Sequence, residues 1–305
     1  MSAVGLPDSF FTADPHWRWL IVLYFFVGGL AGGSYFLAAL IDLFGRPWER
    51  PLARLGYYVA LPGVILSAIL LIVDLRRPER FWHMLVQSET FQPMLKAWSP
   101  MSIGSWALLV FGAFALGSFL AALAEPRPWG WRWLSLFRPP GVVGTLFVIV
   151  GALLGLYVAG YTGVLLAVTS RPLWADTTLL GLAFIVSAAS TSAALLILLG
   201  EPRRLALSGI AALKRLDAWV LVLELLVLVG LVVSLGAVAR AWLDAWGLLF
   251  ILGVVVVGIL IPLALHWRPR VIGGIGTLAS AALVLIGGFI LRVVVVLSNQ
   301  DLGVH

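Results

Sequence analysis

The chain has 305 residues, of which 62% are hydrophobic and 11% are charged, whereas an ordinary soluble domain is about 25% charged. It contains no cysteine, which excludes a disulfide or a thiolate-bound iron–sulfur cluster within this chain. Its four histidines all lie near expected helix ends or in loops, so they cannot supply paired ligands for a haem inside the membrane. Any electrons that such a chain handles must come from a partner and a diffusible cofactor.

Apolar runs of 20 or more residues recur along the chain, each long enough to cross a hydrocarbon core of about 30 Å. We expect one membrane domain over residues 1–305, with eight crossings and no soluble domain. The expected helices span approximately 17–43, 52–73, 102–123, 141–169, 177–199, 216–239, 246–265 and 272–297. The N-terminus lacks the basic region and cleavage site of a removable signal peptide, so the first helix is expected to direct insertion.

The basic residues predict the orientation of these helices, because Lys and Arg accumulate in cytoplasmic loops. The connections after the first, third, fifth and seventh runs hold most of them: Arg46, Arg50, Arg54, Arg127, Arg132, Arg138, Arg203, Arg204, Lys214, Arg215, Arg268 and Arg270. We therefore expect a multi-pass protein of the bacterial cytoplasmic (inner) membrane with both termini extracytoplasmic. The net charge of +6 then reflects topology; we expect membrane lipid around the chain and no nucleic acid.

The centre of the first helix is made of small residues: Gly28, Gly29, Ala31, Gly32, Gly33 and Ser34. Small residues at i and i+4 let another helix backbone or a flat ring approach closely. The pattern predicts a flattened helix face, with Gly28 and Gly32 as part of a binding surface.

The two halves of the chain resemble each other weakly. Residues 27–34 align with residues 186–193, small residue against small residue. Each half has four crossings, so both halves begin on the same side of the membrane. The two halves therefore have the same orientation in the membrane and form a parallel repeat. We expect an all-α integral membrane fold in which residues 17–169 and 177–297 form two four-helix bundles.

The connection between the second and third helices, about residues 74–101, is the longest on the side otherwise poor in basic residues. Its own basic residues are Arg76, Arg77, Arg80 and Lys96. Ser99-Pro100 has the pattern of an N-cap followed by a first helical position. The loop is either a docking surface or lid, or an interfacial segment whose Phe81 and Trp82 lie among lipid headgroups.

Five polar side chains are expected near the extracytoplasmic face: Tyr24, Asp74, His83, Tyr161 and Arg292. At about 1.5 Å of rise per residue, Tyr24 lies about 10 Å and Tyr161 about 12 Å below that surface. Polar groups at this depth usually face the protein interior, so the pattern predicts a ligand pocket that opens to this face. Individually, Arg292 could instead snorkel to the interface and Tyr24 could belong to the aromatic belt.

Glu224 is expected in the opposite half of the membrane, about eight residues from the cytoplasmic end of the helix at 216–239. A carboxylate among leucines is paired, protonated or part of a proton path. Glu224 is therefore a candidate for a proton path, with Ser67 and Ser234 as the few polar groups available to connect it. A structural carboxylate bonded to a neighbouring helix is the alternative.

Four segments together carry a resemblance to a known family: Gly28-Gly-Leu-Ala-Gly-Gly33, Asp74-Leu-Arg-Arg-Pro-Glu-Arg-Phe81, Tyr161-Thr-Gly-Val-Leu-Leu166 and Ser170-Arg-Pro-Leu-Trp174. On these motifs the chain resembles the NrfD-type membrane subunits, the family of the polysulfide reductase membrane subunit. The likeness covers essentially all eight helices. It implies a quinone-binding membrane anchor subunit of a multisubunit respiratory oxidoreductase, without haem, iron–sulfur cluster or metal of its own.

The resemblance also implies partners and a cofactor. The quinone is menaquinone or ubiquinone. The partners typical of the family are an iron–sulfur cluster subunit and a molybdopterin catalytic subunit, docked here on the extracytoplasmic face. The alternative function belongs to another class of protein: a secondary transporter with parallel repeats. A transporter of this kind would have its binding site at the membrane midplane.

The resemblance assigns roles to the candidate site residues. Tyr161 corresponds to the family's pocket tyrosine and is expected to bond a quinone carbonyl, while Asp74 or His83 exchanges protons. Where the family's polysulfide reductase has a histidine early in the first helix, this chain has Tyr24. The second hydrogen-bond partner of the quinone is therefore either Tyr24 or His83.

Two further cationic side chains are expected to complete this pocket. They are Arg77, in the loop after the second helix, and Arg292, near the end of the last helix.

Overall fold

The structure is a computed structural model that describes residues 19–75, 77–125, 132–169, 173–236, 238, 242, 244–267 and 269–301. Within these ranges the chain is helical almost throughout and forms no β-strand; Val86 and Pro93 make one isolated bridge. Eight helical segments of the described chain are long and apolar enough to cross a membrane. The predicted all-α membrane class is therefore confirmed.

Six of the spans are single helices: α1 (Trp19–Phe44), α2 (Arg50–Asp74), α3 (Pro100–Ala124), α4 (Val142–Ala167), α5 (Leu180–Gly200) and α6 (Leu207–Leu235). The seventh span joins α7 (Ala245–Leu249), the π-helical η5 (Phe250–Leu260) and α8 (Ile261–Trp267), and the eighth lies within α9 (Pro269–Asp301). Short 3₁₀ turns cover η1 (Pro47–Glu49), η2 (Pro78–Met84) and η3 (Arg132–Phe137).

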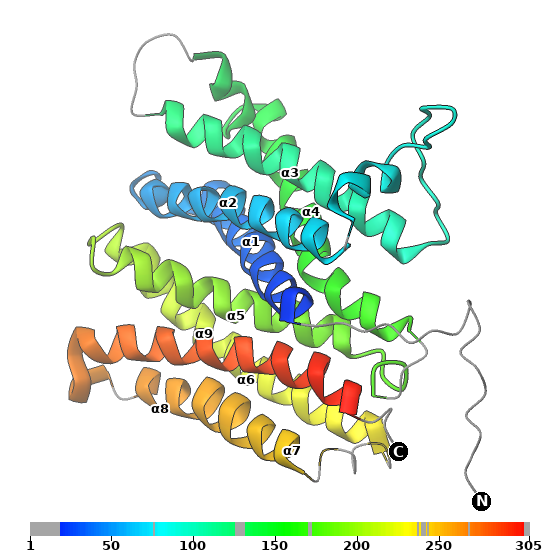
Figure 1. The fold of residues 1–305 in the computed structure, drawn as a ribbon. Coiled ribbons are helices and arrows are strands. Elements are labelled where there is room, and N and C mark those ends of the chain that lie inside the picture. Colours follow the sequence, from blue (N-terminus) through cyan, green and yellow to red (C-terminus); the bar gives the residue numbers. More distant parts are fainter. Residues whose placement is uncertain are drawn as a thin grey trace, which may run out of the picture.

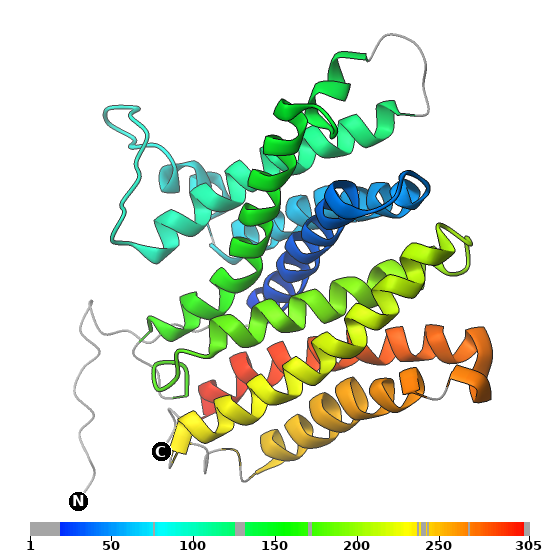
Figure 2. The same ribbon diagram turned by 180° about the vertical axis from the view of Figure 1, so that it is seen from behind.

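The helices gather around two central ones. Figure 1 shows α1 and α5 in the middle, with α2, α3 and α4 on one side and α6 to α9 on the other; Figure 2 shows the same division from behind. The start of α1 and the end of α9 lie at the same end of the molecule as the segment between α2 and α3. The internal parallel repeat stays a prediction.

The boundaries of α6 differ most from the sequence-based expectation. The helix begins at Leu207 instead of residue 216, and it ends at Leu235, before Gly236 with its positive φ of 53°. The charged stretch expected in a loop is helical, and Lys214 within it pairs with Glu201, just after the end of α5, at 3.0 Å. This early start changes the membrane depth of every polar residue on α6.

The small residues of α1 serve helix packing on several sides. A Cβ atom on Gly32 would overlap the carbonyl oxygen of Gly155 on α4, and one on Gly33 would overlap Ser192 on α5. The close approach of two backbones is what small-residue motifs permit in membranes. Gly32 is therefore in contact with a neighbouring helix backbone.

Gly28 has more room than Gly32, and this difference gives a matched pair of variants. A Cβ atom at Gly28 would meet the Ser67 hydroxyl at 3.5 Å, an ordinary contact. We expect Gly32→Ala to destabilise the folded chain by about 1–3 kcal/mol through overpacking against α4, and Gly28→Ala to change its stability little. Thermal unfolding of both purified variants in one detergent checks this; equal unfolding temperatures would contradict the α1–α4 contact.

Candidate functional site

Tyr24 and Tyr161, predicted as pocket residues, are both buried inside the helix assembly. Tyr24 lies five residues after the start of α1 and Tyr161 six residues before the end of α4, so both are about 8–9 Å from the same ends of their helices. The structure thus places these two tyrosines at the same depth on α1 and α4, two helices that pack closely against each other at Gly32 and Gly155.

Tyr157 joins them, although the sequence analysis did not single it out. Its ring stacks on that of Tyr161, with centroids 5.8 Å apart and planes inclined by 27°. The four-residue spacing on α4 puts both side chains on one face of the helix, which is a signal that the sequence contained. Tyr24, Tyr157 and Tyr161 are called the tyrosine group below.

The start of α3 holds Tyr161 in place. The Tyr161 hydroxyl donates a hydrogen bond of 2.6 Å to the carbonyl oxygen of Pro100. One turn further along α3, a Cβ atom on Gly104 would overlap the Tyr161 ring, so glycine is required there. Ser99 caps this helix by accepting a bond from the Ser102 backbone N–H, as the Ser-Pro pattern predicted.

Three other candidates lie where α2 ends and η2 begins. Asp74 is the last residue of α2, and Arg77 is exposed at the N-cap of η2. The His83 ring stacks on Trp82 at 3.9 Å, and its Nδ1 is 3.1 Å from the Arg80 carbonyl oxygen. These contacts hold His83 against its own 3₁₀ segment and do not join it to the tyrosine group.

Arg292 lies in the interior, with only 1% of its surface exposed, so it does not snorkel to the interface. Its guanidinium donates to the Ser187 hydroxyl at 2.5 Å and to the Gly288 carbonyl at 2.7 Å. It also lies 5.2 Å from the ring centroid of Phe184 and 5.9 Å from that of Phe26, both favourable cation–π distances.

Glu224 belongs to the same cluster as Arg292, which corrects its expected position in the opposite half of the membrane. Ser190 donates to the Glu224 carboxylate at 2.7 Å, and Ser187 adjoins the same carboxylate. Since α6 begins at Leu207, Glu224 lies eleven residues before the end of the helix, about 16 Å deep from that end. Arg292 lies nine residues before the end of α9, at about 14 Å. Glu224, Arg292, Ser187 and Ser190 are called the Glu–Arg cluster.

Aromatic side chains separate the Glu–Arg cluster from the tyrosine group. Phe25 packs edge-on against Phe184 at 6.0 Å and lies 5.5 Å from the Tyr24 ring. Phe184 in turn lies under the Arg292 guanidinium. The two polar sites therefore lie in one half of the membrane but are distinct.

A further buried carboxylate, Asp217, was missed by the sequence analysis. It lies two helical turns before Glu224 on α6, and its side chain pairs with His266 Nε2 at 3.6 Å. The His266 ring also lies 3.2 Å from the Ser280 hydroxyl. The seven-residue spacing of the two acids on one helix face was the available signal.

Eight apolar spans with charged groups buried between them define a multi-pass integral membrane protein. The family model described as "Polysulphide reductase, NrfD" matches residues 9–302. The chain belongs to the NrfD polysulphide reductase family.

Individual relatives agree with this membership. The chain is 31% identical over 277 residues to a polysulfide reductase component of Wolinella succinogenes, covering 82% of each sequence. It is 27% identical to protein NrfD of Escherichia coli strain K12, covering 93% of this chain and 95% of that one. A selenate reductase subunit of Mesobacillus selenatarsenatis is 28% identical over 112 residues, which is 37% of this chain and 24% of the relative.

One of the family motifs noted in the sequence, at residues 170–174, is only partly described by the structure, because residues 170–172 lie outside the described residues.

Proposed function

We propose that this chain is the quinone-binding membrane subunit of a multisubunit oxidoreductase, passing electrons between a quinol and an iron–sulfur partner. The observation that carries the proposal is the tyrosine group: Tyr24 and Tyr161 are buried, Tyr157 is 42% exposed and stacks on Tyr161, and Tyr161 is bonded to the start of α3. Family membership supports the anchor role, because two of the relatives are themselves named as single components of reductases.

The hydrogen bonding of Tyr161 fits a quinone. Its hydroxyl donates to a carbonyl oxygen, that of Pro100, and a quinone presents the same type of acceptor. When bound, a quinone supplies a carrier of two electrons and two protons. The proposed role of Tyr161 is to donate its one hydroxyl proton to a quinone carbonyl, which would replace the Pro100 carbonyl as acceptor, and that of Tyr24 is to orient the ring from α1.

Gly28 and the end of α2 complete the proposed pocket. Gly28 lies beside the Tyr24 ring and Ser67, where a Cβ atom would make only ordinary contacts, whereas Gly32 packs directly against the backbone of α4. Asp74 and His83 remain the proposed proton-exchanging groups, because a carboxylate and an imidazole can each accept and release a proton. Arg77, exposed beside them, would attract an anionic species, and Arg292 belongs to the Glu–Arg cluster instead.

The partner is proposed to dock over residues 74–101, of which residue 76 lies outside the described residues. This segment exposes large apolar side chains, including Phe91 at 73% and Trp98 at 81%, beside its basic residues. Exposed aromatic residues of this kind are typical of protein interfaces. The partners would be an iron–sulfur subunit and a molybdopterin catalytic subunit on the extracytoplasmic face. Residues 7–16 are also proposed to contribute to docking; they lie outside the described residues.

Purification of the assembly in mild detergent tests the proposed function. A quinone and a cluster-bearing subunit are expected to co-purify with this chain, and added quinol should reduce the clusters. A chain that purifies alone, without quinone, and catalyses solute exchange in vesicles would instead favour a transporter.

Single cysteines test the orientation, since the natural chain contains none. We expect a membrane-impermeant maleimide to label Gln87→Cys in intact cells and to label Pro202→Cys only after the cells are opened. Both positions are exposed turns, whereas Ala211, which the sequence placed in a loop, lies within α6. Labelling of Pro202→Cys alone in intact cells would invert the orientation and move the partner to the cytoplasm.

Glu224 remains a proposed proton-path residue. Asp217 and His266 extend the line of titratable groups on α6 and α8 from the Glu–Arg cluster toward the other membrane face. In reconstituted complex, Glu224→Gln is expected to abolish proton movement. Oxidation of quinol bound at the tyrosine group should continue. Proton movement that matches wild type would reject the path and leave Glu224 as a structural carboxylate.

A further inference from the structure

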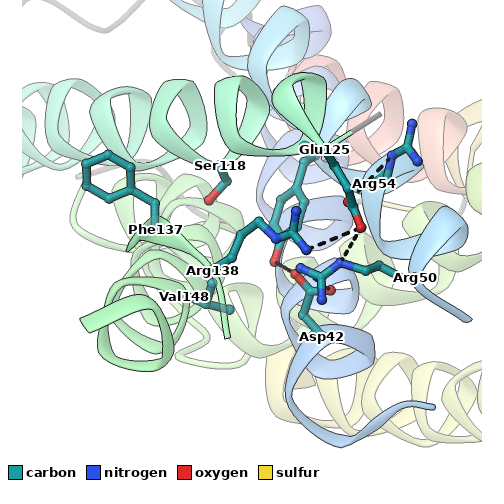
Figure 3. A pocket seen from close by; sticks show the side chains of 10 residues that line it. Asp42, Arg50, Arg54, Ser118, Glu125, Phe137, Arg138 and Val148 are labelled. Atoms are coloured by element: carbon teal, nitrogen blue, oxygen red, sulfur yellow. Dashed lines mark hydrogen bonds and ion pairs between the residues drawn. The ribbon is translucent and has the colours of Figure 1, made fainter. Parts of the chain in front are cut away.

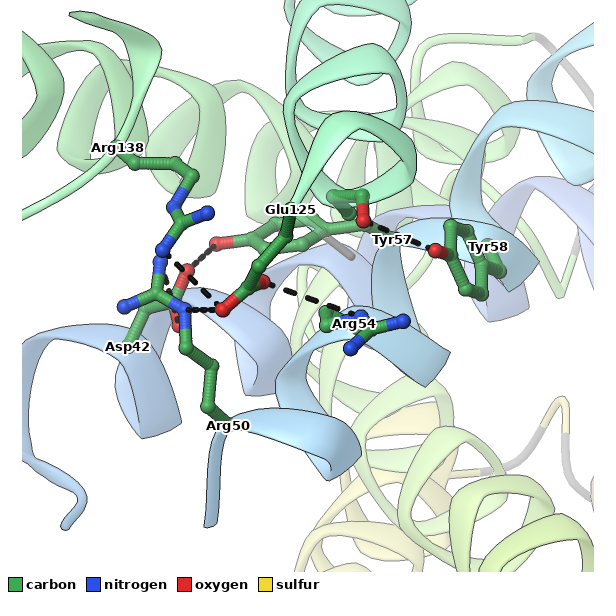
Figure 4. Close-up of polar contacts among 8 residues, drawn as sticks. Asp42, Arg50, Arg54, Tyr57, Tyr58, Glu125 and Arg138 are labelled. Carbon is green, nitrogen blue, oxygen red and sulfur yellow. Dashed lines mark hydrogen bonds and ion pairs between the residues drawn. The ribbon is translucent and has the colours of Figure 1, made fainter. Parts of the chain in front are cut away.

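Three arginines gather at the opposite end of the first four helices, away from the tyrosine group. Arg50 and Arg54 come from the first two turns of α2, and Arg138 comes from the segment between η3 and α4. They surround Glu125, which directly follows α3, and Asp42 near the end of α1 (Figures 3 and 4). These five residues are called the arginine cluster.

The two carboxylates do not neutralise the arginine cluster. Glu125 Oε1 lies 2.9 Å from Arg50 Nε and 3.2 Å from an Arg138 terminal nitrogen, whereas Arg54 Nε is 3.9 Å from Glu125 Oε2. One carboxylate thus faces three guanidinium groups.

Asp42 is the second carboxylate of the arginine cluster. Its side chain is buried, accepts a hydrogen bond of 3.0 Å from the Tyr57 hydroxyl, and lies 4.0 Å from the Arg50 guanidinium. The formal charges of the three arginines and two carboxylates sum to +1, and Arg54 makes the longest of the contacts with Glu125, at 3.9 Å. Burial, and after it the neighbouring Arg50, lowers the pKa of the Arg138 guanidinium below its ordinary value.

The arginine cluster is accessible and lies at a membrane boundary. The side chains of the three arginines are 22–29% exposed, and all three lie at helix ends, where a spanning segment meets the headgroups. The pocket between them is lined on its apolar side by Ala122, Phe137 and Val148. Apolar side chains exposed on η3 and at the start of α4 continue this surface: Leu136, Val142, Val143 and Leu146.

We propose that the arginine cluster binds the phosphate group of an anionic phospholipid, whose acyl chains lie along the exposed start of α4. Guanidinium groups pair with phosphate through parallel charge-assisted hydrogen bonds. Basic pockets between membrane helices, at the level of the headgroups, suit anionic lipids. The enclosed space is about 10 Å³, room for about one water-sized group, so a phosphate oxygen enters while the rest of the headgroup stays at the mouth.

Lipid binding to the purified chain, with its partners if they co-purify, tests this site. Native mass spectrometry after titration with phosphatidylglycerol, or with phosphatidylcholine of the same acyl chains, measures the apparent Kd of each lipid. We expect preferential retention of phosphatidylglycerol and a Kd weakened about fivefold for each arginine removed, in Arg54→Gln and in Arg54→Gln with Arg138→Gln. Arg54→Lys, which keeps the charge but loses the forked pair of donors, should bind phosphatidylglycerol more tightly than Arg54→Gln and less tightly than wild type.

Arg203 provides the matched control. It is exposed just after the end of α5 on the same side of the molecule, and its guanidinium donates to the Leu199 carbonyl at 2.6 Å. Arg203→Gln should retain phosphatidylglycerol as wild type does. If Arg54→Gln binds phosphatidylglycerol with unchanged affinity, or if both lipids bind equally, the proposal is wrong. Displacement of the lipid by millimolar inorganic phosphate would make this a free-anion site and would equally overturn it.

Discussion

Replacing Tyr161 with phenylalanine is expected to lower quinol-dependent reduction of the partner's clusters by about tenfold to about a hundredfold. The change removes one hydroxyl and keeps the ring that packs against Gly104 and Tyr157. A bound quinone would then lose a hydrogen bond, and its carbonyl would be left buried without a donor. Steady-state oxidation of a quinol analogue by the purified complex measures the effect as a change in kcat/KM.

Tyr35 supplies the control for the Tyr161 variant. It is also a fully buried tyrosine, on the same helix as Tyr24, but its hydroxyl bonds Ser118 at 2.8 Å toward the opposite end of the molecule. Tyr35→Phe should leave the quinol oxidation rate unchanged while it removes a buried hydroxyl of the same kind. If Tyr161→Phe and His83→Ala both oxidise quinol at the wild-type rate, the pocket does not lie at the tyrosine group.

Replacing Arg292 with methionine is expected to destabilise the folded chain by about 3 kcal/mol. Removing one member of a buried charged cluster leaves the remaining charge without compensation, here the carboxylate of Glu224. The Ser187 hydroxyl and the Gly288 carbonyl also lose a charged donor. Denaturant unfolding of the purified chain in detergent measures the free energy.

A second substitution distinguishes this coupling from a packing defect. Adding Glu224→Gln to Arg292→Met removes the stranded charge, so part of the lost stability should return. If the two substitutions simply add their losses, Glu224 and Arg292 do not interact, and the Glu–Arg cluster is not one site.

The number of crossings could be predicted from the sequence because each apolar run is long enough to span the membrane by itself. The start of α6 could not, because Lys214 and Arg215 resemble loop residues, whereas in the structure they lie within the helix and Lys214 pairs with Glu201 of the turn before it. That one boundary error moved Glu224 to the wrong half of the membrane.

The functional site was likewise predictable from the sequence only in part. The depths of Tyr24 and Tyr161 follow from helical rise, so their common level in the membrane could be predicted. Tyr157 was not singled out, although its four-residue spacing to Tyr161 was a signal for the ring stacking seen in the structure. The pairing of Arg292 with Ser187 depends on how α9 rotates against α5, and an apolar helix carries little information about rotation. Asp217 was overlooked because its partner, His266, lies on a distant helix.

Photoaffinity labelling with an azido-quinone tests the central claim most directly, because it locates the quinone without relying on activity. In the purified complex, we predict cross-links to peptides from the first half of α1 and the second half of α4, around Tyr24, Tyr157 and Tyr161. Excess unlabelled quinone should suppress them, and Tyr161→Phe should weaken them. Labelling confined to α6 and α9 around the Glu–Arg cluster, or labelling that excess quinone does not suppress, would contradict the account.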